Sequence, residues 1–297
     1  MSFKKSQMKS IKIYIEKAGL QTTIQDLGRF GLRAFGIPIS GAMDSNAHQM
    51  ANKLVGNDIN APTLEMTLKG DKIHFLNHAK IAITGSDMSA KLNDNICPIY
   101  QIIEVEAGDI LSFGFSKTGC RTYLAIQGKM KADFDFNSYS TYLYGKFGGY
   151  KGRKIANDDI ITIENEINES VNFSIDKNKI PIYSNSISVK VIPAPEFDWF
   201  SKQVIRHFFE TKYTVTTDNN RMGMKLSGLS ILLEKPRKMI SSPTALGTIQ
   251  VLPNGQLIIL LHDGQITGGY PRIVNVVLED IGRLAQLKTG DLVQFKS

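Results

Sequence analysis

The sequence predicts a mainly β protein with a few helices, and three features of the chain lead to this prediction. The first is a phrase that occurs four times, a tight turn containing aspartate followed by alternating apolar residues, which begins at Gly70, Gly108, Asp158 and Gly290. Alternation with a period of two is typical of half-buried strands, and many short strands entered through tight turns favour a barrel or a sandwich. The copies follow no fixed period, which argues against a solenoid or a propeller.

The second feature is a hairpin near the C-terminus. Residues 248–252 form a short β-rich run, and the following Pro253, Asn254 and Gly255 supply the fixed and positive φ values of a tight turn. Residues 257–261, with the sequence LIILL, form an apolar run of strand length that has no polar face. We therefore expect a central strand that is buried on both faces.

The third feature is that only one stretch has a strong helical pattern. The apolar residues of Ser45–Val55 recur with helical spacing on one face, Asp44 precedes them as an N-cap, and Gly56 follows as a stop. We expect Asp44 to act as a cap more than as a catalytic group. His48 lies two positions from the apolar stripe, so we expect it on the surface.

Weaker patterns complete the predicted elements. Residues 187–192 and 213–217 alternate as strands, and residues 196–210 are predicted to form a helix. The stretch 272–287 begins with β-branched residues, which favours a strand, and it ends in a short helix at residues 279–286.

The chain is predicted to contain two subdomains. The stretch 166–186 is polar and rich in asparagine and lysine, which is typical of a linker. We therefore predict an N-terminal β-rich subdomain over residues 11–165 and a C-terminal β-rich subdomain over residues 187–297.

Composition bounds the class of protein. With 297 residues, 42% of them hydrophobic and 21% charged, the chain has the composition of a soluble globular protein. No apolar run reaches membrane-spanning length and the start of the chain lacks the apolar core of a secretory signal, so we expect a cytoplasmic protein without a membrane partner. The distant Cys97 and Cys120 are expected to be reduced thiols. The net charge of +7 comes from scattered lysines, which favours a solvated surface over a nucleic-acid site.

Polar residues and glycines gather directly after the LIILL run. The group comprises His262, Asp263, Gln265, Thr267, Gly268, Gly269 and Tyr270. The end of a buried strand holds such groups rigidly at the edge of the solvent, and paired glycines let a ligand approach the backbone. The alternative is a tight turn whose hydroxyls and amides bond their own backbone.

Three arginines are candidates for binding a carboxylate or a phosphate, because the guanidinium fork matches either anion. Arg29 lies near Asp26, Arg221 lies near Asp218, and Arg153 ends a loop rich in glycines and cations. For the first two, the alternative is an ion pair with the neighbouring aspartate that fixes a turn. The glycine-rich loop matches neither the P-loop nor the dinucleotide-binding pattern.

Three stretches together resemble the biotin-dependent carboxyltransferase family. Residues 247–272 read GTIQVLPNGQLIILLHDGQITGGYPR, residues 22–44 contain TTIQDLGRFG and GIPISGAMD, and residues 221–223 resemble the family's DRMG turn. The family includes the C subunit of the bacterial 5-oxoprolinase, the KipA-type antagonist of a kinase inhibitor, and the carboxyltransferase part of urea amidolyase. The resemblance extends in colinear order from about residue 11 to the C-terminus.

The resemblance implies two cyclophilin-like β-barrel subdomains and three possible functions. The leading expectation is the C-like component of an ATP-dependent 5-oxoprolinase, which opens 5-oxoproline to glutamate together with an A-like (LamB/YcsF-type) and a B-like (KipI-like) protein. One alternative is a KipA-type regulatory protein that antagonises a KipI-like kinase inhibitor. The other is a carboxyltransferase component that moves carboxylate from carboxybiotin to urea or a similar amide.

Activation of an amide or urea requires donors for an oxyanion, cations for an anionic group, and a group that handles protons. We assign Asp263 as the leading proton-handling group, with Gln265, Thr267 and Asp26 as further catalytic candidates. The residues assigned to substrate or anion binding are Arg29, Arg221, Arg153, Gln250, Gly268, Gly269, Tyr270, Ser40 and Asp44.

No cofactor is expected to be bound covalently, and no metal site is predicted. The chain contains no AMKM biotin-attachment segment, for which Met130-Lys131 is a poor substitute, and His74 and His78 lie at a strand end where their spacing does not converge on one metal. ATP would be used by the complex.

Three positions depart from the family pattern. Asn137 and Tyr139 stand where the family tends to glycine and arginine, and Gly264 stands where arginine or alanine is frequent. The arginine absent at Tyr139 removes one candidate anion-binding group, so a different amide substrate stays open.

Overall fold

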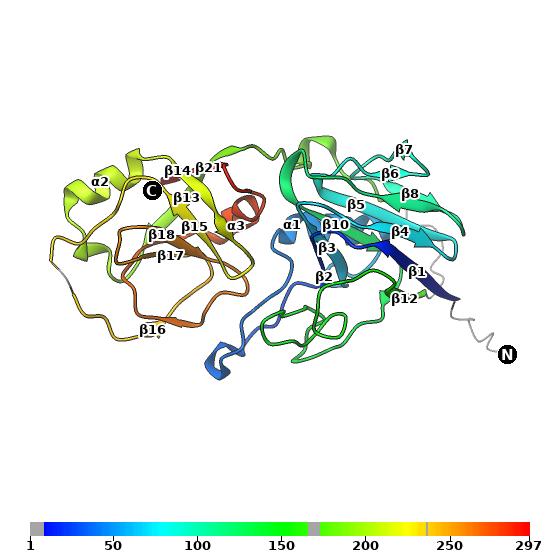
Figure 1. The fold of residues 1–297 in the computed structure, drawn as a ribbon, viewed down its shortest axis with the longest axis horizontal. Helices are drawn as coiled ribbons and strands as arrows, with labels where there is room; N and C mark the ends of the chain where they lie inside the picture. The colour runs from blue at the N-terminus through cyan, green and yellow to red at the C-terminus, as the bar shows by residue number, and fades with distance from the viewer. Residues whose placement is uncertain (1–8, 166–172, 236) are drawn as a thin grey trace. The chain divides into compact units, whose positions relative to one another are not determined.

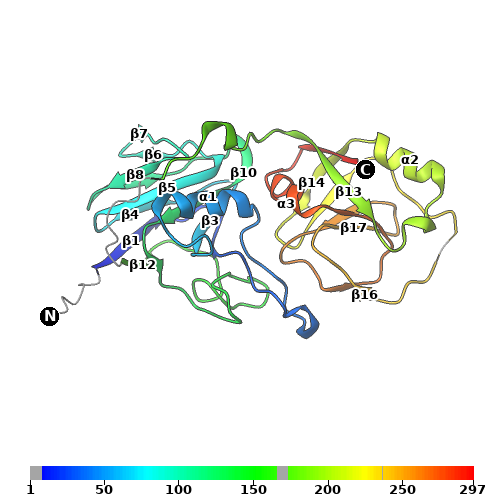
Figure 2. The same cartoon turned by 180° about the vertical axis from the view of Figure 1, so that it is seen from behind.

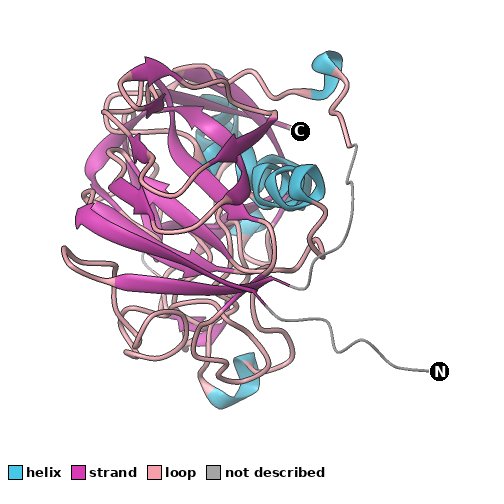
Figure 3. Ribbon diagram, turned by 90° about the vertical axis from the view of Figure 1, so that its right-hand side faces the viewer, coloured by secondary structure: helices cyan, strands magenta, loops and turns pink. Residues whose placement is uncertain are grey.

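The computed structural model describes residues 9–165, 173–235 and 237–297. The chain divides into two compact units: unit 1 comprises Met1–Arg29 and Asp44–Ile182, and unit 2 comprises Phe30–Met43 and Tyr183–Ser297. Strands and loops make up most of the described chain and helices are few, as Figure 3 shows. The predicted mainly β class is therefore confirmed.

Two sheets form most of unit 1 (Figure 1). In chain order their strands are β1 (Lys9–Lys17), β2 (Gln21–Gln25), β3 (Thr63–Thr67), β4 (Lys72–Phe75), β5 (Ala79–Asp87), β6 (Lys91–Leu92), β7 (Asn95–Ile96), β8 (Ile102–Val105), β9 (Ile110–Ser112), β10 (Thr118–Ile126), β11 (Lys129–Met130) and β12 (Ile160–Asn165). The seven-stranded sheet has the order β11-β12-β1-β4-β9-β6-β7, and the five-stranded sheet has the order β2-β3-β10-β5-β8. Apolar side chains of both sheets, such as Ile13 and Phe75 from the first and Ile24 and Leu64 from the second, share one hydrophobic core. A short 3₁₀ turn, η2 (Lys177–Lys179), follows later in unit 1.

Unit 2 is built on a closed barrel. Its strands are β13 (Ser186–Pro193), β14 (Tyr213–Asn219), β15 (Gly223–Ser227), β17 (Thr248–Val251), β18 (Leu257–Leu260), β20 (Arg272–Val276) and β21 (Leu292–Lys296), joined in the order β13-β20-β17-β18-β15-β14-β21. A separate two-stranded sheet joins β16 (Ser242–Pro243) to β19 (Thr267–Gly268). The predicted hairpin is confirmed: β17 and β18 pair antiparallel, and β18 lies between β17 and β15.

Three of the four repeated aspartate turns share one hydrogen-bond pattern. The four copies lead into β4, β9, β12 and β21, as predicted. In three of them the aspartate carboxylate accepts a hydrogen bond from the backbone N–H three residues earlier, at 2.8 Å in Asp109 and Asp159 and 2.9 Å in Asp291. Asp71, in the remaining copy, accepts instead from the Gly19 N–H at 2.5 Å and the Thr22 hydroxyl at 2.7 Å. The local bond closes the turn before β9, β12 and β21, whereas Asp71 ties the turn before β4 to residues 19–22.

The predicted helix of unit 1 is α1 (Ser45–Val55), and it packs on β5 and β10 (Figure 2). Asp44 caps it by accepting from the Ala47 N–H at 3.1 Å, and Gly56 ends it in the left-handed conformation at φ 73°. The prediction that His48 is on the surface is wrong. His48 is fully buried because its polar edge bonds the Thr63 hydroxyl at 2.9 Å.

The helix predicted over residues 196–210 is shorter than expected. A 3₁₀ turn, η3 (Phe197–Trp199), comes first, and α2 (Lys202–Glu210) begins after Ser201, whose hydroxyl caps it. The strand and helix predicted within residues 272–287 correspond to β20 and α3 (Leu278–Ala285).

Residues 30–43 join unit 2, although the predicted N-terminal subdomain contained them. This segment includes η1 (Arg33–Phe35) and ends at Met43, whose side chain lies in the barrel's hydrophobic core. The Arg33 guanidinium also donates to the Thr244 carbonyl at 2.7 Å. Of the predicted linker, residues 166–172 lie outside the described residues, and the stretch to Ile182 belongs to unit 1.

Candidate functional site

Arg221 and Asp263 form a buried ion pair in unit 2. The Asp263 carboxylate accepts from Arg221 Nε at 2.8 Å and from Arg221 Nη2 at 3.3 Å, and the Asp263 N–H donates to the Arg221 carbonyl at 2.9 Å. Arg221 Nη2 also donates to the Gly41 carbonyl at 2.7 Å. The alternative pairing with Asp218 is not the one observed, because Asp218 pairs with Lys225 at 2.8 Å. Arg221 and Asp263, 42 positions apart in the sequence, thus fix the turn that follows β18.

This geometry favours a positioning role for Asp263. The buried carboxylate is held at two points by one guanidinium, which fixes both side chains in place. The neighbouring Ser40 contributes through its backbone, whose N–H donates to the His262 carbonyl at 3.0 Å. The turn that follows β18 therefore brings together three separately predicted site residues, Arg221, Asp263 and Ser40.

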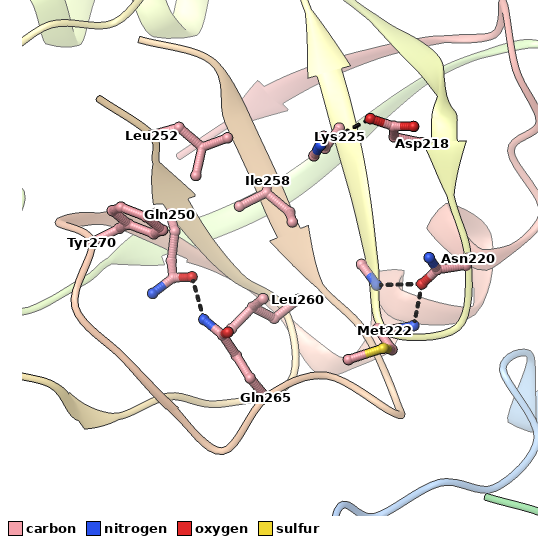
Figure 4. Close-up of a pocket in the computed structure, with 11 residues that line it drawn as sticks. Asp218, Asn220, Met222, Lys225, Gln250, Leu252, Ile258, Leu260, Gln265 and Tyr270 are labelled. Carbon is pink, nitrogen blue, oxygen red and sulfur yellow. Dashed lines mark hydrogen bonds and ion pairs between the residues drawn. The ribbon is translucent and has the colours of Figure 1, made fainter. Parts of the chain in front are cut away.

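Gln250 and Gln265 form a second group, on the outer face of the barrel (Figure 4). Gln265 Nε2 donates to Gln250 Oε1 at 3.0 Å. Ile249 and Val251 point into the hydrophobic core, so Gln250, between them on β17, points outward. The loop that carries Gln265 is fixed by Thr244, whose hydroxyl donates to the Gln265 carbonyl at 2.6 Å.

A pocket of about 350 Å³ opens beside this glutamine pair. Its lining residues are Asp218, Asn220, Met222, Gly223, Lys225, Gln250, Leu252, Ile258, Leu260, Gln265 and Tyr270. Sequence reasoning named Gln250, Gln265 and Tyr270, but it missed Lys225. Lys225 lies on the strand that neighbours the hairpin, which is a feature of the sequence. Its place in the pocket depends on the pairing of β15 with β18, which the sequence does not show.

The glycines near this pocket have different roles. A Cβ on Gly268 would lie 2.3 Å from Gln250 Nε2, so a side chain at this position would displace the glutamine amide. A Cβ on Gly264 would lie 2.8 Å from the carbonyl oxygens of Leu261 and Met222, which accounts for glycine at this departure from the family pattern. Gly269 makes only ordinary contacts, and Thr267 is exposed on β19.

Asp26 and Arg29 lie in unit 1, where they fix the same loop. Asp26 accepts from the hydroxyls of Ser138 at 2.7 Å and Ser140 at 2.5 Å, and from the backbone N–H groups of Gly28 at 2.8 Å and Tyr139 at 2.7 Å. Four donors hold the carboxylate, three of them at Oδ1, so Asp26 is placed as an anchor more than as a base.

Arg29 bonds the same loop from the other side. One guanidinium nitrogen donates to the Ser140 carbonyl, and the guanidinium stacks on the Phe147 ring at 4.9 Å. Asn137 adopts a positive φ of 61°, which asparagine tolerates, and this conformation accounts for asparagine at a position where the family tends to glycine. Tyr139 contributes its backbone to Asp26, while its ring packs on Phe134 with centroids 4.6 Å apart.

The glycine-rich loop before Arg153 is occupied by carboxylates of the chain itself. The Gly148 N–H donates to Asp135 at 2.9 Å, and the Lys151 N–H donates to Asp133 at 3.1 Å. Arg153 forms a two-point ion pair with Asp159, at 2.7 Å for each contact. This arrangement does not favour the predicted anion cradle, and it leaves Arg153 apart from the other candidates.

Sequence reasoning also missed a buried polar row on the five-stranded sheet. Thr23, Glu65, Tyr123 and Thr84 lie side by side on β2, β3, β10 and β5, and all four are buried. The Tyr123 hydroxyl donates to Glu65 at 2.8 Å and accepts from the Asp44 N–H at 2.7 Å. Burial, followed by the Glu65 charge, raises the pKa of Tyr123 well above its ordinary value. The Asp44 side chain thus caps α1, and its backbone N–H donates to Tyr123 of this row.

Two further properties concern metals and membranes. Among residues 9–165, 173–235 and 237–297, no group of three or more His, Cys, Asp or Glu side chains is placed to hold a metal ion. His74 bonds Glu16, and His78 bonds Glu106 at 3.0 Å. None of the helices in the described parts of the chain is long and apolar enough to cross a membrane.

Comparisons with known proteins identify relatives along nearly the whole chain. The C subunit of the 5-oxoprolinase of Haemophilus influenzae is 36% identical over 278 residues, which are 93% of this chain and 88% of that protein. The corresponding protein of Escherichia coli is 35% identical, over 95% of this chain and 89% of its own length.

Structural similarity extends to a larger enzyme. The crystal structure of the Kluyveromyces lactis urea amidolyase superposes with a TM-score of 0.90 at 32% identity, over 96% of this chain, and the chain spans 18% of that protein. Residues 35–297 match the family described as carboxyltransferase domain, subdomain A and B. The predicted resemblance is thereby confirmed, and the chain belongs to this carboxyltransferase domain family.

Proposed function

We propose that this chain is the C-like component of an ATP-dependent 5-oxoprolinase. The observation that carries the proposal is the similarity to the C subunit of the Haemophilus influenzae 5-oxoprolinase, because it extends over most of both proteins. The urea amidolyase of Saccharomyces cerevisiae, at 34% identity, is matched over only 17% of its length.

The proposed reaction is hydrolysis of a lactam. Water adds across the C–N bond of 5-oxoproline, its oxygen goes to the carbonyl carbon, and a proton goes to the nitrogen, which gives glutamate. Hydrolysis of ATP to ADP and phosphate in the complex supplies the free energy. In unit 2, the amides of Gln250 and Gln265 supply neutral groups that suit a lactam, and the Arg221–Asp263 pair holds the adjoining turn in position.

The proposed partners are an A-like (LamB/YcsF-type) protein and a B-like (KipI-like) protein. The Haemophilus influenzae relative is by name one subunit of its enzyme, which supports an assembly of several different chains. In this proposal the assembly is cytoplasmic, no cofactor is attached covalently to this chain, and catalysis depends on the partners.

The test is glutamate formation from 5-oxoproline and ATP. It is measured for this chain alone, for the A-like and B-like proteins together, and for all three, each with and without ATP. We expect activity only in the complete mixture with ATP. Equal activity without this chain would overturn the proposal, and so would a stable but inactive complex, which would favour the KipA-type regulatory role.

A second candidate is carboxyl transfer from carboxybiotin to urea, which the TM-score of 0.90 to a urea amidolyase structure supports. In that case another protein would supply the biotin. The same preparation, given a carboxybiotin carrier and urea, would then release free carrier faster than it does without urea. A urea-independent rate would count against this candidate.

A further inference from the structure

We propose that the pocket on the outer face of β15, β17 and β18 binds a small cyclic amide that carries a carboxylate, with the amide at Gln250 and Gln265 and the carboxylate at Lys225. 5-Oxoproline is the representative of this class. The inference rests on the proposed function and adds where in the chain the substrate binds and which of its groups are recognised.

The glutamine pair contains a buried donor that lacks an acceptor. Gln250 is 1% exposed, and its Nε2 finds no hydrogen-bond partner among the described residues. Figure 4 shows its amide oxygen turned toward Gln265 and its amide nitrogen turned away. Buried polar groups are nearly always bonded, and a rotation of the Gln250 amide that turns this covered nitrogen into the pocket would let a ligand supply its acceptor. An amide ligand offers both a C=O acceptor and an N–H donor, which complements the glutamine pair in either orientation of its side chains.

The spacing across the barrel strands matches the size of such a ligand. Gln250 pairs with Ile258, and Ile258 pairs with Lys225, so the three form one row over three strands. Two strand spacings separate the ends of the row by roughly 10 Å between Cα atoms. A small molecule that spans this row would meet the glutamine amides at one end and the Lys225 ammonium, which lies at Asp218, at the other.

Lys225 can bind the carboxylate of the ligand. The Lys225 ammonium has three N–H donors, and the bond to Asp218 at 2.8 Å uses one of them. A ligand carboxylate can therefore join Lys225 while Asp218 stays bound. Because Asp218 offsets much of the charge of Lys225, the pocket disfavours a polyphosphate, and a ligand carboxylate would be held mainly by hydrogen bonds from the ammonium.

Part of the pocket lining is apolar. Ile258, Leu260 and Leu252 lie between the polar ends of the pocket, and Tyr270 borders it with 41% of its surface exposed. A volume of about 350 Å³ is within the range of small-molecule sites, roughly 300–1,000 Å³. Hydrocarbon lining suits the methylene groups of a ring. Urea has neither methylene groups nor a carboxylate, so this pocket favours the cyclic acid.

The experiment measures binding to the intact chain by isothermal titration calorimetry. The ligands are 5-oxoproline, proline, which lacks the lactam carbonyl, and 2-pyrrolidinone, which lacks the carboxylate. We expect 5-oxoproline to bind about tenfold or more tightly than either analogue, because each loses one recognised group. Gln250→Leu should remove the preference over proline, and Lys225→Met should remove the preference over 2-pyrrolidinone.

Two controls separate binding from folding. Lys80→Met removes another partly exposed lysine, which pairs with Glu104 on neighbouring strands of unit 1, and it should leave binding unchanged. Gly268→Ala adds a methyl group against Gln250 Nε2 and should weaken binding about tenfold without removing a polar group. Circular dichroism and melting temperature verify that each variant is folded.

The outcomes distinguish this inference from the proposed function. If the reconstituted complex turns over 5-oxoproline but Gln250→Leu and Lys225→Met keep the original KM and Kd, the pocket assignment is overturned and the proposed function stands. If the complex is inactive while the chain binds 5-oxoproline through Gln250, the site stands and the proposed function fails. If the chain alone shows no binding, a tenfold rise in KM of the complex with Gln250→Leu supports the site, and an unchanged KM overturns it.

Discussion

Burial determines what the Arg221–Asp263 pair contributes to stability. Both side chains are about 4% exposed, so removal of one partner leaves the other charge in a poorly solvated site. We predict that Asp263→Asn lowers the free energy of unfolding by about 3–5 kcal/mol, the usual cost of breaking a buried pair. Urea denaturation followed by fluorescence measures the change.

The control for this prediction is an exposed ion pair. Lys131 and Glu164 approach to 3.6 Å with 72% and 43% of their side chains exposed, so Lys131→Met should cost less than about 1 kcal/mol. An equally small change in Asp263→Asn would show that the Arg221–Asp263 pair does not hold its turn.

His48 makes the stability depend on pH. Burial lowers its pKa from the usual 6.5 to about 4, against the opposing effect of the Asp26 and Glu65 charges. The unfolded chain therefore binds more protons between these values, and stability is complete above about pH 6.5 and is lost as the pH falls toward 4. At about 1.4 kcal/mol for each pKa unit, the full effect is about 3 kcal/mol.

The measurement compares the free energy of unfolding at pH 7 and pH 4.5 for the original chain and for His48→Gln. Glutamine is neutral throughout, so the difference between the two proteins isolates the histidine from the carboxylates that titrate in the same range. We expect the original chain to lose about 2 kcal/mol more than the variant. Parallel losses in the two proteins would show that His48 is not buried in its neutral form.

For single residues, the sequence predicted the members of the candidate site better than it predicted their bonding partners. Asp263 and Arg221 were both candidates, but the sequence linked Arg221 to the nearby Asp218, because only the folded barrel brings Asp263 to it. His48 was assigned to the surface because it lies outside the apolar stripe. The sheet face under α1 is itself polar, with Thr63 and Glu65 among its residues, and that face is the product of pairing between distant strands.

Among the elements, α1 shows why local signals can be sufficient. Its bounds were predicted in full, because a cap, an apolar stripe and a glycine stop all lie within thirteen consecutive residues. The strands after the aspartate turns were recognised for the same reason. Strand order was not predictable, since β10 pairs with β3 and β5 across about 30–60 residues and nothing local encodes that choice.

Substitutions of Asp44 can distinguish its role as the cap of α1 from a role in binding substrate. We predict that Asp44→Ala lowers the free energy of unfolding by about 0.5–2 kcal/mol, because the Ala47 N–H loses its acceptor, whereas Asp44→Ser keeps an acceptor and most of the stability. Thermal denaturation distinguishes them. If Asp44→Ser retains stability but loses activity in the complete enzyme mixture, the carboxylate also serves the substrate. Equal melting temperatures of the original chain and Asp44→Ala would refute the capping role.

For the whole molecule, continuity of sequence is a poor guide to the units. A contiguous division was predicted because residues 166–186 have the composition of a linker. Nothing in the composition of segment 30–43 marks it as part of unit 2. Its Gly41 carbonyl nevertheless accepts from Arg221, and its Met43 side chain lies in the core of unit 2. Such a contribution depends on contacts with residues about 180 positions later, which a linear pattern does not contain.

This assignment predicts where the effect of a core mutation appears. Met43 immediately precedes Asp44 and α1 of unit 1, but its buried side chain belongs to the barrel core. Met43→Ala removes buried surface and leaves a cavity, which costs about 2–5 kcal/mol. Hydrogen exchange of the intact chain should therefore accelerate at the amides of β17 and β18 and stay unchanged at β3 and β10. Leu64→Ala, in the core of unit 1, should produce the reverse pattern. Equal acceleration in both units by either variant would mean that the two cores unfold together, and that the chain behaves as one cooperative body in spite of its two hydrophobic clusters.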